Sequence, residues 1–180
     1  MSNKARLIEI LNERSVRYGS FVLASGKESD FYLDGRQTTL DPEGAWIISE
    51  MILDRLNPEV QAIGGLTMGA DPVACSVSAV SWKKGQPMPA FLIRKQPKGH
   101  GLKRCVEGRD RLEKGAKVCI VEDTTTTGGS LLEAIEKAEN EGLVVVQTLT
   151  VVDREEGASA RLAAAGFDLE ALVGRSDLEA

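Results

Sequence analysis

Residues 117–130 constrain the fold more than any other stretch, because an apolar run there passes directly into two carboxylates and a loop of small polar residues. The run itself, 118–121, is apolar and rich in β-branched residues and follows a Lys-Gly turn, which predicts a buried strand ending at Val121. Glu122 and Asp123 come next. The pattern therefore predicts a strand whose carboxyl end presents two acidic side chains.

The loop after the acidic pair has the composition of a phosphate-binding turn. Four threonines and two glycines occupy 124–129, and an apolar pattern with helical spacing starts at Leu131. Ser130 and Glu133 have the spacing of a capping box, so we expect the loop to run into a helix N-terminus. Such a loop gathers unpaired backbone N–H groups at the positive end of a helix dipole, which favours a phosphate. The alternative is a Thr/Gly turn between strand and helix that holds no ligand.

The acidic pair needs a partner other than the phosphate, which it would repel. A sugar diol or a Mg²⁺ ion would satisfy it. The chain has neither Gly-Lys-Ser/Thr nor Gly-x-Gly-x-x-Gly, so a nucleoside-triphosphate loop and a Rossmann dinucleotide site are not expected. A ribose with a 5′-phosphate fits both halves of the motif, with its phosphate on the loop and its diol on Glu122 and Asp123.

Apolar runs and helical patterns alternate along most of the chain. We expect strands at 60–64, 90–93, 118–121, 143–152 and 169–173, and helices at 42–56, 72–82, 131–142 and 155–165. Asp41-Pro42 is a good start for the first of these helices, whose buried face is expected to include Trp46, Ile47 and Met51. The alternation predicts an α/β fold with a mostly parallel twisted sheet flanked by helices, and a site at the carboxyl ends of the strands.

The first forty residues break this alternation. A helical pattern at 4–14 places Leu7, Ile8 and Leu11 on one face, and short strands are expected at 19–23 and 31–34. We expect a single domain, 1–180, in which residues 1–40 form a small subdomain over the site.

Composition narrows the class of function. The 180 residues are 42% hydrophobic and 27% charged, which is ordinary for one globular domain. A net charge of −5 does not suggest a nucleic-acid partner, and neither a signal core nor a membrane-spanning run is apparent. The three cysteines, Cys75, Cys105 and Cys119, lack Cys-x-x-Cys spacing, so we expect reduced thiols in the cytoplasm rather than disulfides or zinc.

A second functional candidate is the polar segment 94–109, which separates two expected strands. Its glycines permit hinge motion, and its first half concentrates positive charge at Arg94, Lys95, Lys98 and His100. Irregular segments of this length in compact domains are usually functional lids or disordered. The segment predicts a mobile catalytic loop suited to a polyanion such as pyrophosphate, with a solvated basic loop as the alternative.

These motifs together resemble a known family. Val-Glu-Asp-Thr-Thr-Thr-Thr-Gly-Gly-Ser at 121–130 is similar to the ribose-phosphate signature of type I phosphoribosyltransferases. Arg-Lys-x-x-Lys-x-His-Gly at 94–101, Ser-Gly-Lys followed by Phe-Tyr-x-Asp, and Asp-Arg at 153–154 extend the resemblance to orotate phosphoribosyltransferases over roughly the whole chain. The resemblance implies a type I phosphoribosyltransferase fold. It also implies transfer of ribose 5-phosphate from phosphoribosyl pyrophosphate to orotate, giving orotidine 5′-monophosphate and pyrophosphate in pyrimidine biosynthesis.

The resemblance also implies roles for residues. Phosphoribosyl pyrophosphate would be bound by Lys27, Arg94, Lys95, Lys98, His100, Glu122, Asp123, Thr124, Thr125, Thr126, Thr127, Gly128, Gly129 and Ser130. Orotate would be bound by Phe31, Tyr32, Thr126 and Arg154. Because Phe31 and Tyr32 alternate along a strand, only one of them is expected to face the ligand. Lys95, Asp123 and His100 would act in catalysis, with Mg²⁺ carried mainly by the pyrophosphate and ribose rather than by direct protein ligands. The active protein would be a homodimer in which Lys95 reaches the neighbouring pocket.

Two alternatives stay open. Phosphoribosyltransferases that act on purines or other bases share the Glu-Asp-Thr-Thr-Thr-Thr-Gly loop, and a regulator with this fold could sense phosphoribosyl pyrophosphate without catalysis. One departure from the family pattern lies at 65–71, which has no lysine where one branch of the orotate enzymes has a Tyr-Lys pair. Only the backbone amides of that loop can therefore be assigned to pyrophosphate.

Overall fold

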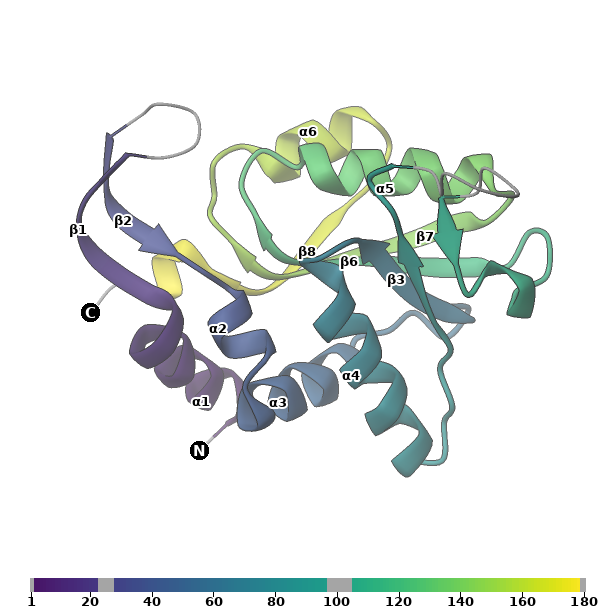
Figure 1. The fold of residues 1–180 in the computed structure, drawn as a ribbon, viewed down its shortest axis with the longest axis horizontal. Coiled ribbons are helices and arrows are strands. Elements are labelled where there is room, and N and C mark those ends of the chain that lie inside the picture. Colours follow the sequence, from purple (N-terminus) through teal and green to yellow (C-terminus); the bar gives the residue numbers. More distant parts are fainter. Residues whose placement is uncertain (1, 23–27, 97–104, 179–180) are drawn as a thin grey trace.

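The computed structural model describes residues 2–22, 28–96 and 105–178, and its centre is a six-stranded sheet (Figure 1). The strand order is β5-β4-β3-β6-β7-β8, and every neighbouring pair is parallel except β4 with β5. The strands are β3 (Ala62–Leu66), β4 (Ala90–Ile93), β5 (Val106–Glu107), β6 (Lys117–Thr125), β7 (Val144–Asp153) and β8 (Leu169–Gly174). This topology confirms the predicted α/β architecture, and β4 has the bounds that the sequence predicts.

Helices cover both faces of the sheet (Figure 1). One face carries α1 (Asn3–Ile10), α3 (Pro42–Leu53) and α4 (Ala70–Lys83), and the other carries α5 (Gly129–Asn140) and α6 (Ala158–Ala164). Each face has its own buried apolar cluster, with Val121 in one and its neighbour Ile120 in the other. Residues 118–121 of β6 are all buried because the strand is covered on both sides, which explains why they read as one apolar run.

Two glycines let β3 lie close to its neighbours. A Cβ on Gly64 would lie 2.2 Å from the carbonyl oxygen of Phe91 in β4, and one on Gly65 would lie 2.1 Å from that of Val121 in β6. Only glycine permits such an approach. β3 and β4 end side by side at the carboxyl edge of the sheet, and β6 continues past them to Thr125. The alternation of strands and helices predicts the site at this edge.

The N-terminal segment forms an antiparallel hairpin of β1 (Val16–Val22) and β2 (Glu28–Leu33), separate from the main sheet. A π-helical turn (Leu11–Ser15) joins α1 to this hairpin, and the short α2 (Arg36–Thr39) follows it. Leu7 and Leu11 are fully buried, as the helical pattern predicts, whereas Ile8 is only partly buried.

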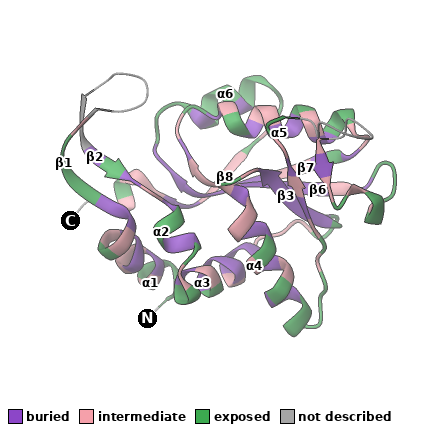
Figure 2. Ribbon diagram, in the orientation of Figure 1, coloured by how far each residue is buried: buried purple, intermediate pink, exposed green. Residues whose placement is uncertain are grey.

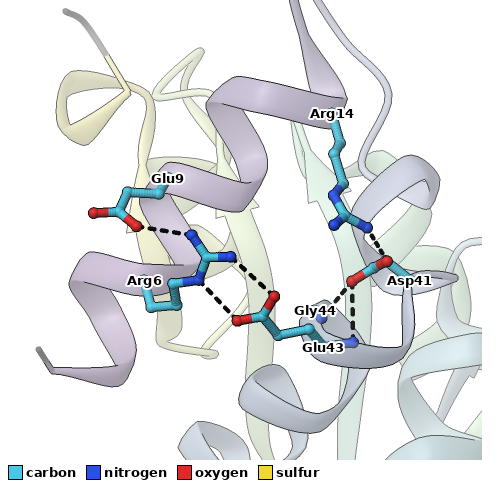
Figure 3. Close-up of polar contacts among 6 residues, drawn as sticks. All are labelled: Arg6, Glu9, Arg14, Asp41, Glu43 and Gly44. Carbon is cyan, nitrogen blue, oxygen red and sulfur yellow. Dashed lines mark hydrogen bonds and ion pairs between the residues drawn. The ribbon is translucent and has the colours of Figure 1, made fainter.

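Ion pairs join the N-terminal helix to α3 (Figure 3). Arg6 donates to both carboxylate oxygens of Glu43, at 2.8 and 2.9 Å. Arg14 pairs with Asp41, whose other oxygen accepts the backbone N–H of Glu43 at 3.0 Å, so Asp41 caps α3 as predicted. These contacts fix the base of the hairpin. From this base, β2 leads directly to the carboxyl edge of the main sheet.

Several element boundaries and one buried residue differ from the sequence expectations. Trp46 was expected in the core but is 41% exposed, with Lys83 Nζ 5.1 Å from the centre of its ring. Ile48 is fully buried instead, in the same apolar cluster as Val121. Figure 2 shows buried residues along α3. The helix itself ends at Leu53 rather than 56. Helix α6 begins three residues late because Glu155 has a positive φ of 59°, which a helix does not accept. No helix within the described ranges is long and apolar enough to cross a membrane.

Candidate active site

A cavity of about 300 Å³ opens at the carboxyl edge of the sheet. It is built where the end of the hairpin meets the ends of β3, β4 and β6 and the start of α5. The lining residues are Tyr32, Leu33, Asp34, Gly35, Arg36, Leu66, Thr67, Met68, Gly69, Lys95, Glu122, Asp123, Thr124 and Ser130. The structure thus brings together Tyr32, Lys95 and the acidic pair, which sequence reasoning selected from separate parts of the chain.

The acidic pair lies within β6 rather than after it. The sequence interpretation ended the strand at Val121, but β6 continues to Thr125 by pairing with β7, with Glu122 opposite Thr150. Burial raises the pKa of Glu122 to about 7, the charge of Asp123 adds to this shift, and hydrogen bonds from Thr125 and Ser130 oppose it. Burial likewise raises the pKa of Asp123. Ionisation of both carboxyl groups is therefore unfavourable in the free protein, and a bound cation or the hydroxyls of a ligand would stabilise the charged forms.

Two glycines shape the space around Asp123. A Cβ on Gly69 would lie 2.4 Å from Asp123 Oδ1, and one on Gly35 would lie 3.3 Å from Asp123 Oδ2 and 2.5 Å from Thr124 Oγ1. The turn after β2 and the loop after β3 therefore enclose the carboxylate from two sides, and neither position has room for a side chain. Sequence reasoning missed Gly35 and Arg36, which directly follow the Phe-Tyr-x-Asp motif. It included Asp34 only as part of that motif, and Gly69 only through the backbone amides of 65–71.

The helix after the loop begins without the predicted capping box. Gly128 is the N-cap, in a left-handed conformation with φ of 75°, and it provides no side-chain cap. The hydroxyl of Ser130 interacts with Glu122 instead. The first N–H groups of α5 therefore have no side-chain acceptor from the cap, and this favours an anion at the helix N-terminus. The uncapped N-terminus of α5, and not a capping box, therefore supports the predicted phosphate-binding loop.

The threonines of the loop differ in what they can reach. Thr125 is buried, and its hydroxyl bonds Glu122 Oε2 at 3.3 Å and Thr150 Oγ1 at 3.0 Å. Its side chain is therefore occupied by these two partners, and the assignment of Thr125 to phosphoribosyl pyrophosphate stays a prediction. Thr124 lines the cavity, and its Oγ1 is buried with no hydrogen-bond partner. Thr126 is half-buried and Thr127 is exposed at the start of the turn, so both are accessible from outside.

The start of the basic segment is anchored to the fold. Lys95 lines the cavity, while Arg94 Nε pairs with Glu107 Oε1 at 2.7 Å. Lys137 Nζ donates to the carbonyl oxygens of Arg94 and Lys95, at 3.0 and 2.9 Å, which fixes the backbone where the segment leaves β4. The predicted ligands Lys98 and His100 lie outside the described residues, as does Lys27. The mobility predicted for 94–109 therefore stays a prediction.

The residues expected to bind orotate fall into two groups. Tyr32 is 40% exposed and lines the cavity, whereas Phe31 is 2% exposed and belongs to the core, so its assignment to the ligand is wrong. Arg154 is 8% exposed and does not line the cavity: its guanidinium pairs with Glu156 Oε1 at 2.7 Å. The backbone of Arg154 is joined to the strand end of the loop, since its N–H donates to Thr125 O at 2.9 Å. Arg154 Nε is buried without a hydrogen-bond partner.

The fold and this site define the class of protein. A mostly parallel sheet whose central strand carries Glu-Asp near its carboxyl end, followed by a Thr/Gly turn and a helix, with a separate hairpin beside the cavity, is the type I phosphoribosyltransferase architecture.

Comparisons with known proteins narrow the class to one family. The chain is 46% identical over 179 residues to the orotate phosphoribosyltransferase of Bradyrhizobium diazoefficiens, covering 98% of this chain and 96% of that protein. Among solved structures it is similar to the Mycobacterium tuberculosis orotate phosphoribosyltransferase in complex with Fe(III) dicitrate, with TM-score 0.85, 36% identity and 99% of each chain covered. The same bacterial enzyme in complex with phosphoribosyl pyrophosphate has TM-score 0.79 and 32% identity, over 98% of this chain and 92% of that one. No family model matches the chain. The chain belongs to the orotate phosphoribosyltransferase family.

Proposed function

We propose that the cavity at the carboxyl edge of the sheet is the site where this enzyme transfers ribose 5-phosphate from phosphoribosyl pyrophosphate to orotate. The products are orotidine 5′-monophosphate and pyrophosphate, in the synthesis of pyrimidine nucleotides. One observation carries this placement: Glu122 and Asp123 face the cavity directly beside the turn that opens α5. A ribose hydroxyl pair and a phosphate, joined in one molecule, match those two neighbouring features.

Each part of the substrates then has a proposed partner. The turn at 126–128 and the first N–H groups of α5 take the 5-phosphate, and the acidic pair takes the ribose hydroxyls. Tyr32 offers a partly exposed ring against which the planar pyrimidine can pack. Arg154 lies outside the cavity lining and pairs with Glu156 in the free protein. We assign it to the orotate carboxylate because its buried Nε has no hydrogen-bond partner and a guanidinium can exchange one carboxylate for another, with two parallel bonds.

The acidic pair also fits Mg²⁺ as the cofactor. Mg²⁺ prefers oxygen ligands and keeps several waters, and two carboxylates whose pKa values are raised by burial would be neutralised by a cation. We assign the ion mainly to the pyrophosphate and ribose, as the family resemblance implies. When bound, it would supply charge neutralisation at the leaving pyrophosphate.

The chemistry requires charge stabilisation rather than a protein nucleophile. Breaking the bond at the ribose C1 leaves a cationic sugar and a pyrophosphate that gains negative charge. Asp123 stabilises the sugar, and Lys95 stabilises the pyrophosphate together with Lys98 and His100. The ring nitrogen of orotate bonds C1 as the bond to pyrophosphate breaks, and its proton passes to the leaving pyrophosphate or to water, so no general base is assigned to the protein. We further propose that the enzyme is a homodimer in which Lys95, which lines the cavity of its own chain in the free protein, acts in the cavity of the neighbouring subunit. Its three free thiols favour a reducing compartment, the cytoplasm.

A base-specificity assay tests the proposed function. Orotate loss is followed spectrophotometrically with phosphoribosyl pyrophosphate and Mg²⁺, in parallel with adenine, guanine, hypoxanthine and uracil. We expect only orotate to be consumed, with equal formation of pyrophosphate. Turnover of a purine in its place would assign the site to a different base. Binding of phosphoribosyl pyrophosphate without consumption of any base would favour a sensing role.

A further inference from the structure

Arg36 lines the cavity, although no sequence motif selects it. It is the first residue of α2, and its Nε donates to Asp34 Oδ1 at 3.0 Å while its backbone N–H donates to the same oxygen at 3.2 Å. Gly35, between these two residues, packs against the side chains of Asp123 and Thr124. The guanidinium is therefore held close to the acidic end of β6, where its charge acts on Asp123.

The charges of the described lining residues give the pyrophosphate few positive partners. Three carboxylates line it, those of Asp34, Glu122 and Asp123, and Arg36 and Lys95 are the only cationic side chains among the described lining residues. The wall formed by 67–69 contributes one hydroxyl and its backbone. Phosphoribosyl pyrophosphate carries a pyrophosphate in addition to the phosphate that the start of α5 can take. That second group needs cations which the loop after β3 does not contain.

We propose that Arg36 is a pyrophosphate-binding residue, an inference that rests on the proposed function. In the free protein its guanidinium pairs with Asp34, and the two side chains are 47% and 19% exposed. Ion pairs of this kind are weak, so the guanidinium can exchange Asp34 for a more highly charged partner. Its planar fork donates two parallel hydrogen bonds to phosphate oxygens, which a single ammonium cannot do. Arg36 thereby supplies the positive charge that residues 65–71 lack.

Direct binding measurements on the full-length protein test this role. Calorimetric titration with Mg²⁺-phosphoribosyl pyrophosphate, and separately with Mg²⁺-pyrophosphate, compares the wild type with Arg36→Gln, Arg36→Lys and a control. The control, Arg55→Gln, also removes a partly exposed ion pair, with Glu170 at 3.3 Å. It lies near the amino end of β7, away from the cavity, since Arg55 O accepts Gln147 Nε2.

Arg36→Gln should weaken binding of both ligands roughly 10- to 100-fold, while the KM for orotate changes less than about twofold. Arg36→Lys should fall between wild type and Arg36→Gln, because it keeps the charge and loses the fork. Arg55→Gln should bind as the wild type does. If Arg36→Gln fails to fold, Arg36→Lys against the wild type decides the question.

Several results would overturn the proposal. Wild-type affinity in the variants at position 36, or an equal loss in Arg55→Gln, would reduce Arg36 to a structural partner of Asp34. The same measurements distinguish failure of the Arg36 proposal from failure of the proposed reaction. A wild type that binds phosphoribosyl pyrophosphate but leaves orotate untouched refutes the assigned reaction and leaves Arg36 standing on the binding data. A wild type that binds neither ligand refutes both.

Discussion

The free protein should lose stability as the pH rises from acidic to neutral, and replacement of Glu122 by glutamine should abolish this loss. Burial, followed by the charge of Asp123, raises the pKa of Glu122 from 4.5 to about 7. The folded protein therefore holds this proton more tightly than the unfolded chain does. The resulting stabilisation is complete below pH 4.5 and is lost as the pH rises through about 7. This shift corresponds to about 3 kcal/mol, and glutamine keeps the shape of the side chain without the charge.

The free energy of unfolding in urea, measured at about pH 5 and about pH 8 without Mg²⁺ or substrate, provides the test. The stability of Glu122→Gln relative to the wild type should rise by about 2–3 kcal/mol over this interval. The control is Glu136→Gln, which removes an exposed carboxylate from α5. A constant difference between Glu122→Gln and the wild type across the pH range would refute the account of a buried, destabilised acidic pair.

Three further predictions concern activity. Asp123→Asn should lower kcat strongly while the protein still folds, and unchanged turnover would make the acidic pair structural. Arg154→Ala should raise the KM for orotate by the equivalent of roughly 2–4 kcal/mol, and that for phosphoribosyl pyrophosphate far less. Equal effects would contradict its assignment to orotate. Inactive Lys95→Ala and Asp123→Asn proteins, after verified subunit exchange, should regain about a quarter of wild-type activity if Lys95 acts across a dimer. No recovery would place Lys95 in its own site.

The sequence predicted most of the fold because its apolar patterns report burial directly. Residues 118–121 and 148–152 are buried on both faces, and their largely apolar and β-branched composition carries that information. The same apolar pattern predicted the wrong end for β6. Hydropathy falls at Glu122, but backbone pairing with β7 continues to Thr125, and polarity does not report pairing. Trp46 illustrates the opposite error, since a large apolar residue was assigned to the core although its position in the helix faces outward.

The site was predictable where one segment carries several functional groups, and it was not where contacts come from distant segments. The motif at 121–130 contains the acidic pair and the loop in one piece. Strand alternation between Phe31 and Tyr32 showed that one of them must face inward, but only the structure identifies it as Phe31. Gly35 and Gly69 enclose Asp123 from two loops that are far apart in sequence. Nothing local to either glycine reports that contact, and the same holds for Arg36.

A structure of the enzyme with bound orotidine 5′-monophosphate would test the central claim most directly. We expect the 5′-phosphate at the turn 126–128 and the first N–H groups of α5, with both ribose hydroxyls within hydrogen-bond distance of Glu122 and Asp123. The pyrimidine ring should lie against Tyr32. A phosphate bound elsewhere, or a ribose turned away from the acidic pair, would contradict the assignment of this cavity as the ribose-phosphate site.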